Sequence, residues 1–184
     1  MAKTLGKKKT AAARPAAAMA KAKAPVKAAA KKQGTPAAGD KAPAFELPDE
    51  NGKMVSLAGF KGKKLVLYFY PKDNTGGCTK EACAFNEALP DFGETGAAVV
   101  GVSADSVDSH RRFKEKQKLN FPLLSDPHRK VLEAYGVWQE KSLYGRKFMG
   151  IVRTTFVIDE KGVIQHVFPK VRVDGHVEAV LQAL

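Results

Sequence analysis

One hydrophobic run, residues 65–70, consists of six consecutive apolar or aromatic residues. Such a run predicts a strand that is buried on both faces, as in sheets covered by helices. Pro71 ends this strand, because proline cannot donate to a strand ladder. Residues 76–89 then predict a helix whose apolar face is formed by Ala82, Phe85 and Leu89. A buried strand therefore leads through a Pro/Gly-rich turn into a helix.

The remainder of residues 40–184 repeats this alternation of apolar runs and turn residues. Strands are predicted at residues 44–47, 54–57, 98–103, 122–126, 150–159 and 163–168. Helices are predicted at residues 105–118, 129–135 and 175–184. An Asn51-Gly52 turn joins the first two strands into a hairpin. Strands and helices in this order predict an α/β domain with a mixed central sheet flanked by helices.

Residues 1–39 differ from the rest of the chain in composition. They are mostly Ala, Lys and Pro, with no aromatic residue and no cysteine. Such a segment cannot bury enough apolar surface to offset the entropy of ordering, so we predict a disordered N-terminal tail. Nine lysines, Arg14 and no acidic residue give the tail +10 of the net charge of +12. It is either a solvated extension or an electrostatic contact for nucleic acid or another polyanion.

Residues 40–184 are long enough for a single domain, and this part of the chain is nearly neutral. Two cysteines are too few for a disulfide scaffold, and their placement in one motif favours redox chemistry in a reducing compartment. No apolar run approaches the 18 residues of a membrane span, and residues 1–39 lack the pattern of a secretory or transit peptide. We therefore expect a cytoplasmic protein that does not enter a membrane.

Both cysteines lie near the start of the helix predicted at residues 76–89. Cys78 is at or near its N-terminus, where unpaired backbone N–H groups and the helix dipole stabilise a thiolate. The thiolate, rather than the thiol, is the nucleophile. Cys78 is therefore predicted to be reactive, and the alternative is a buried, inert thiol.

The spacing of Cys78 and Cys83 limits how they can interact. On a regular helix, five residues correspond to a rise of about 7.5 Å and a rotation of roughly 140°, which separates the Cα atoms by about 8.6 Å. A disulfide needs a Cα separation of about 4.4–6.8 Å. The two thiols can form a bond only if the first turns of the helix unwind, so redox state is predicted to be coupled to local unfolding.

The same residues resemble a known family. The pattern Pro71-x-x-x-Thr75-x-x-Cys78 resembles the peroxiredoxin active-site motif, and Cys83 resembles the resolving cysteine of the bacterioferritin-comigratory (BCP, Q-type) subfamily. Other segments similar to this subfamily are residues 68–73, 135–138 and 150–159. The resemblance covers about residues 40–184 and implies a thioredoxin-like fold.

The resemblance also implies roles for the motif residues. The Cys78 thiolate would attack the O–O bond of a hydroperoxide, giving a sulfenic acid and releasing water or an alcohol. Cys83 would condense with the sulfenic acid to an intramolecular disulfide. The Thr75 hydroxyl would contact the peroxide oxygen and the thiolate, and Pro71 would shield the thiolate from water. The alternatives are a small buried hydrophobic residue for Cys83 and a plain turn residue for Thr75.

Arg153 lies in an apolar run, where a permanently charged guanidinium is costly unless it is paired. Beside Cys78 it would stabilise the thiolate and hold the polarised peroxide, which is the role that the resemblance implies. The alternative is an exposed arginine on an edge strand. Glu81, three residues after Cys78, matches a family position that orients this arginine, although a glutamate on the helix surface fits the pattern as well.

These observations predict a cofactor-free thiol peroxidase for hydrogen peroxide and organic hydroperoxides. Thioredoxin or a similar dithiol protein would supply the electrons, and an intramolecular disulfide is compatible with the monomer that we expect. No metal site is predicted, because Cys-x4-Cys is not a zinc-finger spacing. One alternative function is nucleic-acid binding through the basic tail, residues 1–39. Another is disulfide exchange without peroxide chemistry, although the usual Cys-x-x-Cys spacing is missing.

Overall fold

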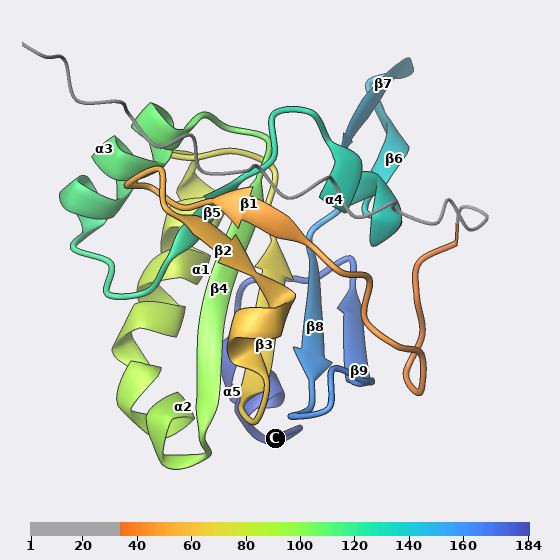
Figure 1. Cartoon of the computed structure of the whole chain (residues 1–184). Helices are drawn as coiled ribbons and strands as arrows, with labels where there is room; N and C mark the ends of the chain where they lie inside the picture. The colour runs from red at the N-terminus through yellow and green to blue at the C-terminus, as the bar shows by residue number, and fades with distance from the viewer. Residues whose placement is uncertain (1–33) are drawn as a thin grey trace, which may run out of the picture.

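A five-stranded mixed sheet forms the centre of the fold (Figure 1). The computed structural model describes residues 34–184. The strands follow one another across the sheet in the order β5 (Leu123–Ser125), β4 (Ala97–Ser103), β3 (Lys64–Phe69), β8 (Thr154–Ile158) and β9 (Ile164–Pro169). β4 is parallel to β3 and β5, and β8 is antiparallel to both of its neighbours. The mixed sheet predicted from the sequence is confirmed.

The middle strand, β3, is buried on both faces. Its side chains alternate between two core clusters, because successive residues of a strand point to opposite faces. Leu65, Leu67 and Phe69 belong to one cluster, and Val66 and Tyr68 belong to the other. The continuous apolar run in the sequence therefore reports a strand covered on both sides.

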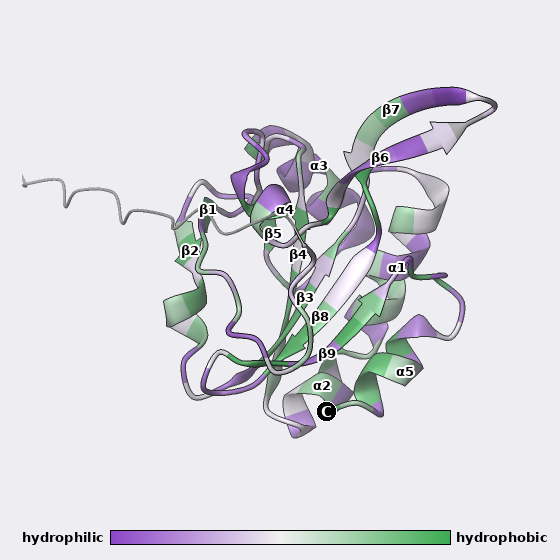
Figure 2. Cartoon of the chain, turned by 90° about the vertical axis from the view of Figure 1, so that its right-hand side faces the viewer, coloured by the Kyte–Doolittle hydropathy of each residue, from purple (hydrophilic) through white to green (hydrophobic). Residues whose placement is uncertain are grey.

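The helices are α1 (Gly76–Glu87), α2 (Leu89–Glu94), α3 (Val107–Gln117), α4 (Lys130–Ala134) and α5 (His176–Leu181). α1 and α2 connect β3 to β4, and α3 connects β4 to β5, as parallel pairs require a crossover. Figure 2 shows α1 and α5 on one side of the sheet and the β1–β2 hairpin on the other. This layering is the thioredoxin-like arrangement, with α1 leaving the end of the central strand.

The first predicted hairpin is confirmed as β1 (Glu46–Pro48) paired with β2 (Met54–Ser56). Its turn is held by Asp49 Oδ1, which accepts hydrogen bonds from the backbone N–H groups of Asn51 and Lys53 at 2.8 and 2.9 Å. A short 3-10 helix, η1 (Leu57–Phe60), follows β2 and leads into the central sheet.

The strand predicted at residues 150–159 is divided in the structure. Its first two residues belong to β7 (Arg146–Ile151), which pairs with β6 (Trp138–Leu143) in a separate hairpin that the sequence analysis missed. Two residues, Val152 and Arg153, then cross to β8 without strand pairing. The backbone N–H of Val152 donates to Val137 O at 2.8 Å, and Arg153 O accepts from the N–H of Val171 at 3.0 Å. These bonds to other segments end one strand and begin the next.

The helix predicted at residues 76–89 is also divided. α1 ends at Glu87, and α2 begins at Leu89 with Pro90 in its first turn. Proline has no backbone N–H and so cannot continue the hydrogen-bond ladder of α1, whereas the first turn of a new helix tolerates it.

The chain makes contacts with the domain from Thr35 onward. The Thr35 hydroxyl donates to Gly136 O at 3.2 Å, and the backbone N–H of Gly39 donates to Ile164 O at 2.8 Å. Residues 34–39, which the sequence analysis placed in the tail, therefore pack against the folded domain. The remainder of the predicted disordered tail lies outside the described residues. Within residues 34–184, no helix is both long and apolar enough to cross a membrane.

Candidate active site

Cys78 lies in the first turn of α1, directly after the turn that follows β3. It is the third residue of the helix, and Thr75 occupies the N-cap position. The side chain is buried, with 2% of its surface exposed, and the thiol is free. The predicted position at a helix N-terminus is confirmed, and the N–H groups of this first turn place partial positive charge around the sulfur.

Arg153 approaches the same sulfur from the junction between β7 and β8. Its Nη2 donates to Cys78 Sγ at 3.1 Å. The sheet explains this meeting, because Thr154 pairs with Phe69 at the end of β3, where the active-site turn begins. The sequence prediction that the Arg153 guanidinium is paired is thus confirmed, and its partners are Cys78 and Glu81.

Glu81 binds the second terminal nitrogen of the Arg153 guanidinium, the one that does not contact Cys78. Arg153 Nη1 donates to Glu81 Oε2, while Oε1 has no hydrogen-bond partner within the described residues. Glu81 is completely buried, and this burial raises its pKa to about 7 although Arg153 acts in the opposite direction. Burial alone would lower the pKa of Arg153, but the charges of Glu81 and Cys78 outweigh it and the pKa is raised. Arg153 therefore remains a cation held against Cys78.

Thr75 and Pro71 lie in the exposed turn between β3 and α1. The Thr75 hydroxyl donates to Lys72 O at 3.1 Å, so its hydrogen is used inside the turn. Its oxygen retains capacity to accept a hydrogen bond. Pro71 lies two residues after the end of β3, and its side chain is exposed. Both residues belong to the segment that leads to Cys78.

Cys83 lies one and a half turns further along α1, on an uninterrupted helix. Its thiol is free and half-buried, and Sγ lies 3.9 Å from Gln117 Oε1 on α3. Cys78 and Cys83 therefore occur in the dithiol form on a wound helix, which is the starting state that their spacing predicts.

Comparisons with known proteins identify the family. A family model described as AhpC/TSA matches residues 38–167. A putative peroxiredoxin Bcp from Coxiella burnetii is 54% identical over 146 residues, which cover 79% of this chain and 97% of that protein. Peroxiredoxin Bcp from Escherichia coli K12 is 44% identical over 147 residues, covering 80% and 94%. The chain is a Bcp/PrxQ-type peroxiredoxin of the AhpC/TSA family.

Solved structures agree with this assignment. The bacterioferritin comigratory protein of Xanthomonas campestris superposes with a TM-score of 0.73 at 43% identity, covering 76% of this chain and 88% of that chain. A PrxQ mutant from Xylella fastidiosa gives a TM-score of 0.75 at 40% identity, covering 79% and 92%. The protein is therefore a peroxidase with a thioredoxin-like fold.

Sequence reasoning missed two buried histidines of this peroxiredoxin. His110 Nδ1 lies 2.9 Å from Asp73 Oδ2, in the turn that precedes Cys78. His176 Nε2 lies 2.8 Å from the Thr155 hydroxyl, near Arg153. Burial lowers the pKa of His176 to about 4, and the charge of Arg153 acts in the same direction. His176 is therefore neutral at neutral pH and adds no charge near the active site.

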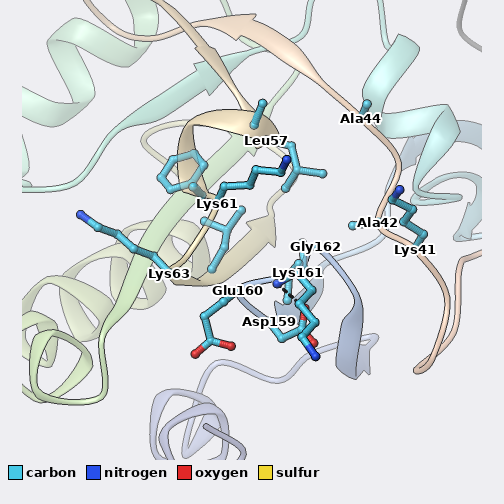
Figure 3. Close-up of a pocket in the computed structure, with 14 residues that line it drawn as sticks. Lys41, Ala42, Ala44, Leu57, Lys61, Lys63, Asp159, Glu160, Lys161 and Gly162 are labelled. Atoms are coloured by element: carbon cyan, nitrogen blue, oxygen red, sulfur yellow. Dashed lines mark hydrogen bonds between the residues drawn. The ribbon is translucent and has the colours of Figure 1, made fainter.

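An apolar pocket of this peroxiredoxin lies away from the cysteines (Figure 3). It has a volume of about 180 Å³, and its lining includes the apolar Leu57, Leu65 and Ile158 and the basic Lys41 and Lys61. Leu65 is the second residue of β3, whereas Cys78 follows the other end of that strand. This pocket is therefore separate from the reacting sulfur. Within residues 34–184, no group of three or more His, Cys, Asp or Glu side chains is arranged to hold a metal ion.

Proposed function

We propose that this peroxiredoxin reduces hydrogen peroxide and organic hydroperoxides through an intramolecular disulfide, and that a dithiol protein such as thioredoxin recycles it. The observation that carries the proposal is the contact of 3.1 Å between Arg153 Nη2 and Cys78 Sγ. A guanidinium at this distance favours the anionic, nucleophilic form of sulfur. The X. campestris relative is described in terms of its alkyl peroxide reduction activity, which supports the substrate class.

In the first step, the Cys78 thiolate attacks the terminal oxygen of the hydroperoxide. An S–O bond forms, the O–O bond breaks, and the leaving oxygen takes a proton and departs as water or an alcohol. Arg153 stabilises negative charge on the sulfur and on the departing oxygen. The Thr75 hydroxyl oxygen accepts the hydrogen bond of the peroxide, and Pro71 limits the access of water to the sulfur.

In the second step, Cys83 resolves the sulfenic acid. Its thiol sulfur bonds to Cys78, the S–O bond breaks, and water leaves. The two residues lie on an uninterrupted helix, with the Cα separation of about 8.6 Å that is too long for a disulfide. The first turns of α1 must therefore unwind before the bond can form.

In the third step, an external dithiol returns the enzyme to its starting state. A thiolate of the reductant attacks the disulfide, and its second thiol completes the exchange, which leaves a reductant disulfide and the two free cysteines of the enzyme. This cycle needs no metal and no bound cofactor.

The Cys83→Ser variant tests the resolving role. We expect the first oxidation of Cys78 to keep its rate within about threefold, because Cys83 does not contact the attacking sulfur. Turnover driven by thioredoxin should fall by about a hundredfold, because no internal disulfide can form. Stopped-flow measurement of peroxide loss, with and without the reductant, separates the two effects.

Intact-mass analysis after one equivalent of peroxide provides the control. The wild-type monomer should lose about 2 Da by forming the disulfide, whereas Cys83→Ser should gain about 16 Da as the sulfenic acid. Unchanged thioredoxin-linked turnover in Cys83→Ser would reassign the resolving role, and a wild-type mass gain of about 16 Da would exclude the internal disulfide.

A second function, nucleic-acid binding, is supported by the charge of the N-terminal segment. Residues 1–39 carry ten basic residues and no acidic one, while the rest of the chain is nearly neutral. Clustered lysines bind phosphates without reading bases, and such binding weakens steeply with salt. The segment would concentrate the peroxidase on nucleic acid without taking part in its chemistry.

Deleting residues 1–33 tests this function, because it removes all ten basic residues of the segment and keeps the contacts that residues 34–39 make with the domain. We expect the full-length protein to bind duplex DNA at low salt and to lose about a hundredfold or more in affinity between 50 and 200 mM salt. The deleted protein should not bind, and its peroxidase rate should be unchanged. Fluorescence anisotropy with labelled DNA measures the binding, and equal affinity of both proteins would contradict the proposal.

A further inference from the structure

A buried hydrogen-bonded cluster lies between α3 and the turn that leads to Cys78. We call it the Asp73 cluster; its members are Tyr70, Asp73, Ser109 and His110. Tyr70 and Asp73 belong to the segment that follows β3, whereas Ser109 and His110 lie in the first turn of α3. The cluster therefore joins the active-site turn to a helix that carries neither cysteine.

The Asp73 carboxylate is fully engaged in this cluster. The Tyr70 hydroxyl donates to Oδ1 at 2.7 Å, and the Ser109 hydroxyl donates to Oδ2 at 2.7 Å. His110 Nδ1 lies 2.9 Å from Oδ2. The backbone N–H of Asp73 also donates to Asp105 Oδ2 at 2.9 Å. Both the side chain and the backbone of one turn residue are thus held by α3 and by the loop before it.

His110 extends the connection into the sheet. Its Nε2 lies 3.1 Å from Leu124 O on β5, and the ring is completely buried. One buried ring therefore bridges the Asp73 carboxylate of the active-site turn and the backbone of β5. Burial alone would raise the pKa of Asp73, but the hydrogen bonds from His110, Ser109 and Tyr70 outweigh it and the pKa is lowered. The contact is therefore a charge-assisted pair shielded from water.

The other end of α3 holds the second half of α1. Cys83 Sγ lies 3.9 Å from Gln117 Oε1, and the backbone N–H of Asn120 donates to Asn86 Oδ1 at 2.7 Å. α3 and the loop after it thus hold the chain on both sides of residues 74–82. These residues include the turns of α1 that must unwind for the disulfide to form.

We propose that Asp73 and His110 form a positioning pair that controls the resolution step, by holding the active-site turn folded until Cys78 moves toward Cys83. This inference rests on the proposed intramolecular disulfide. When the pair separates, the Cys78 sulfenic acid condenses with the Cys83 thiol and water leaves. While the pair holds, a second peroxide competes by transferring an oxygen to the same sulfur, which gives a sulfinic acid and water or an alcohol. The strength of the pair therefore sets the balance between disulfide formation and overoxidation.

The test uses His110→Phe, which keeps a ring of similar size and removes both hydrogen bonds, and Ser109→Ala, which removes one hydrogen bond at a half-buried position. Rapid quenching with mass analysis follows the sulfenic acid and the disulfide over time. We expect disulfide formation to become about tenfold faster in His110→Phe and about threefold faster in Ser109→Ala. Each variant loses at least one hydrogen bond to the charged Asp73 carboxylate, which lowers the free energy needed to open the active-site turn. The overoxidised fraction at high peroxide should fall in parallel, while the first oxidation changes less than about threefold.

Tyr135→Phe is the matched control. It removes the hydrogen bond from the Tyr135 hydroxyl to Pro43 O. Tyr135 belongs to the core cluster on one face of the sheet, whereas Phe85 of α1 belongs to the cluster on the other face. We expect disulfide formation in Tyr135→Phe to keep the wild-type rate. If it became as fast as in His110→Phe, a general loss of stability would explain the effect, and the inference would be contradicted. Equal or slower disulfide formation in Ser109→Ala would also overturn it, even if His110→Phe fails to fold. A wild-type enzyme that forms no internal disulfide would instead refute the proposed function itself.

Discussion

Replacing Cys78 with serine should abolish peroxide reduction. We expect the second-order rate constant to fall by more than about a thousandfold, because a serine hydroxyl is not ionised at neutral pH and lacks the polarisable sulfur that accepts an oxygen atom. The substitution removes one buried sulfur from a site that is already polar, so the fold should remain. Stopped-flow measurement of peroxide loss under single-turnover conditions checks the expected result.

Cys83→Ser is the control for Cys78→Ser, because it also replaces one α1 cysteine by serine. Its first oxidation should continue while that of Cys78→Ser stops. The two variants should have similar circular dichroism, since both retain the helix. If Cys78→Ser still consumed peroxide while Cys83→Ser did not, Cys83 would be the peroxidatic residue. That result would contradict the mechanism.

The sequence reveals the parts of this site that depend on short-range patterns. The strand at β3, the turn after it and the helix that carries Cys78 follow from six apolar residues, Pro71 and a helical period. The position of Cys78 at a helix start is therefore a local property of the chain. Its spacing from Cys83 is likewise local, and the geometry of a single helix is sufficient to predict that the two thiols do not meet.

Arg153 shows where such reasoning becomes indirect. The cost of burying a guanidinium in an apolar run indicates that Arg153 has a partner, but the run does not show that the strand is interrupted there. The interruption depends on hydrogen bonds from Val152 to Val137 and from Val171 to Arg153, which connect segments distant in sequence. The sheet order then places this junction beside the end of β3.

The Asp73 cluster was not predictable from pattern alone. Asp73 reads as a turn residue, and His110 lies on a largely polar helix 37 residues away. One sequence feature pointed to a buried side chain: His110 is three residues before Phe113 and shares its face of α3, and both are buried. The β6–β7 hairpin was missed for a related reason, since its exposed strands lack apolar alternation. Its Tyr144-Gly145 turn, with both φ values positive, is typical of a two-residue hairpin.

Replacing Arg153 with methionine should lower the rate of Cys78 oxidation by about a hundredfold to a thousandfold, the usual effect of removing one charge-stabilising donor. Methionine fills a similar volume but offers neither a charge nor a donor to Cys78 Sγ. Arg153→Lys should recover only part of the rate, because an ammonium group cannot reproduce the fork that contacts both Cys78 and Glu81. Stopped-flow kinetics with hydrogen peroxide measures both variants.

The same substitution should destabilise the fold in a pH-dependent way, because it leaves Glu81 buried without its ion pair. The pKa of Glu81, already raised to about 7 by burial, rises further once the opposing attraction of Arg153 is lost. A carboxyl group with a raised pKa in the folded state keeps its proton at pH values where the unfolded chain has already lost it, so stability falls as the pH rises between the two pKa values. The deficit of Arg153→Met relative to wild type should therefore grow above pH 7, by up to about 1.4 kcal/mol per pH unit. Urea unfolding at pH 6, 7 and 8 measures it.

Glu81→Gln combined with Arg153→Met separates catalysis from stability. An amide at this position carries no charge, so the double variant should lose the added pH dependence and regain most of the stability that Arg153→Met loses. Its peroxide rate should remain as low as that of Arg153→Met, because the cation beside Cys78 is still missing. If the double variant instead recovered its rate together with its stability, the role of Arg153 would be structural, and stabilisation of the thiolate would have to come from the N-terminus of α1 alone.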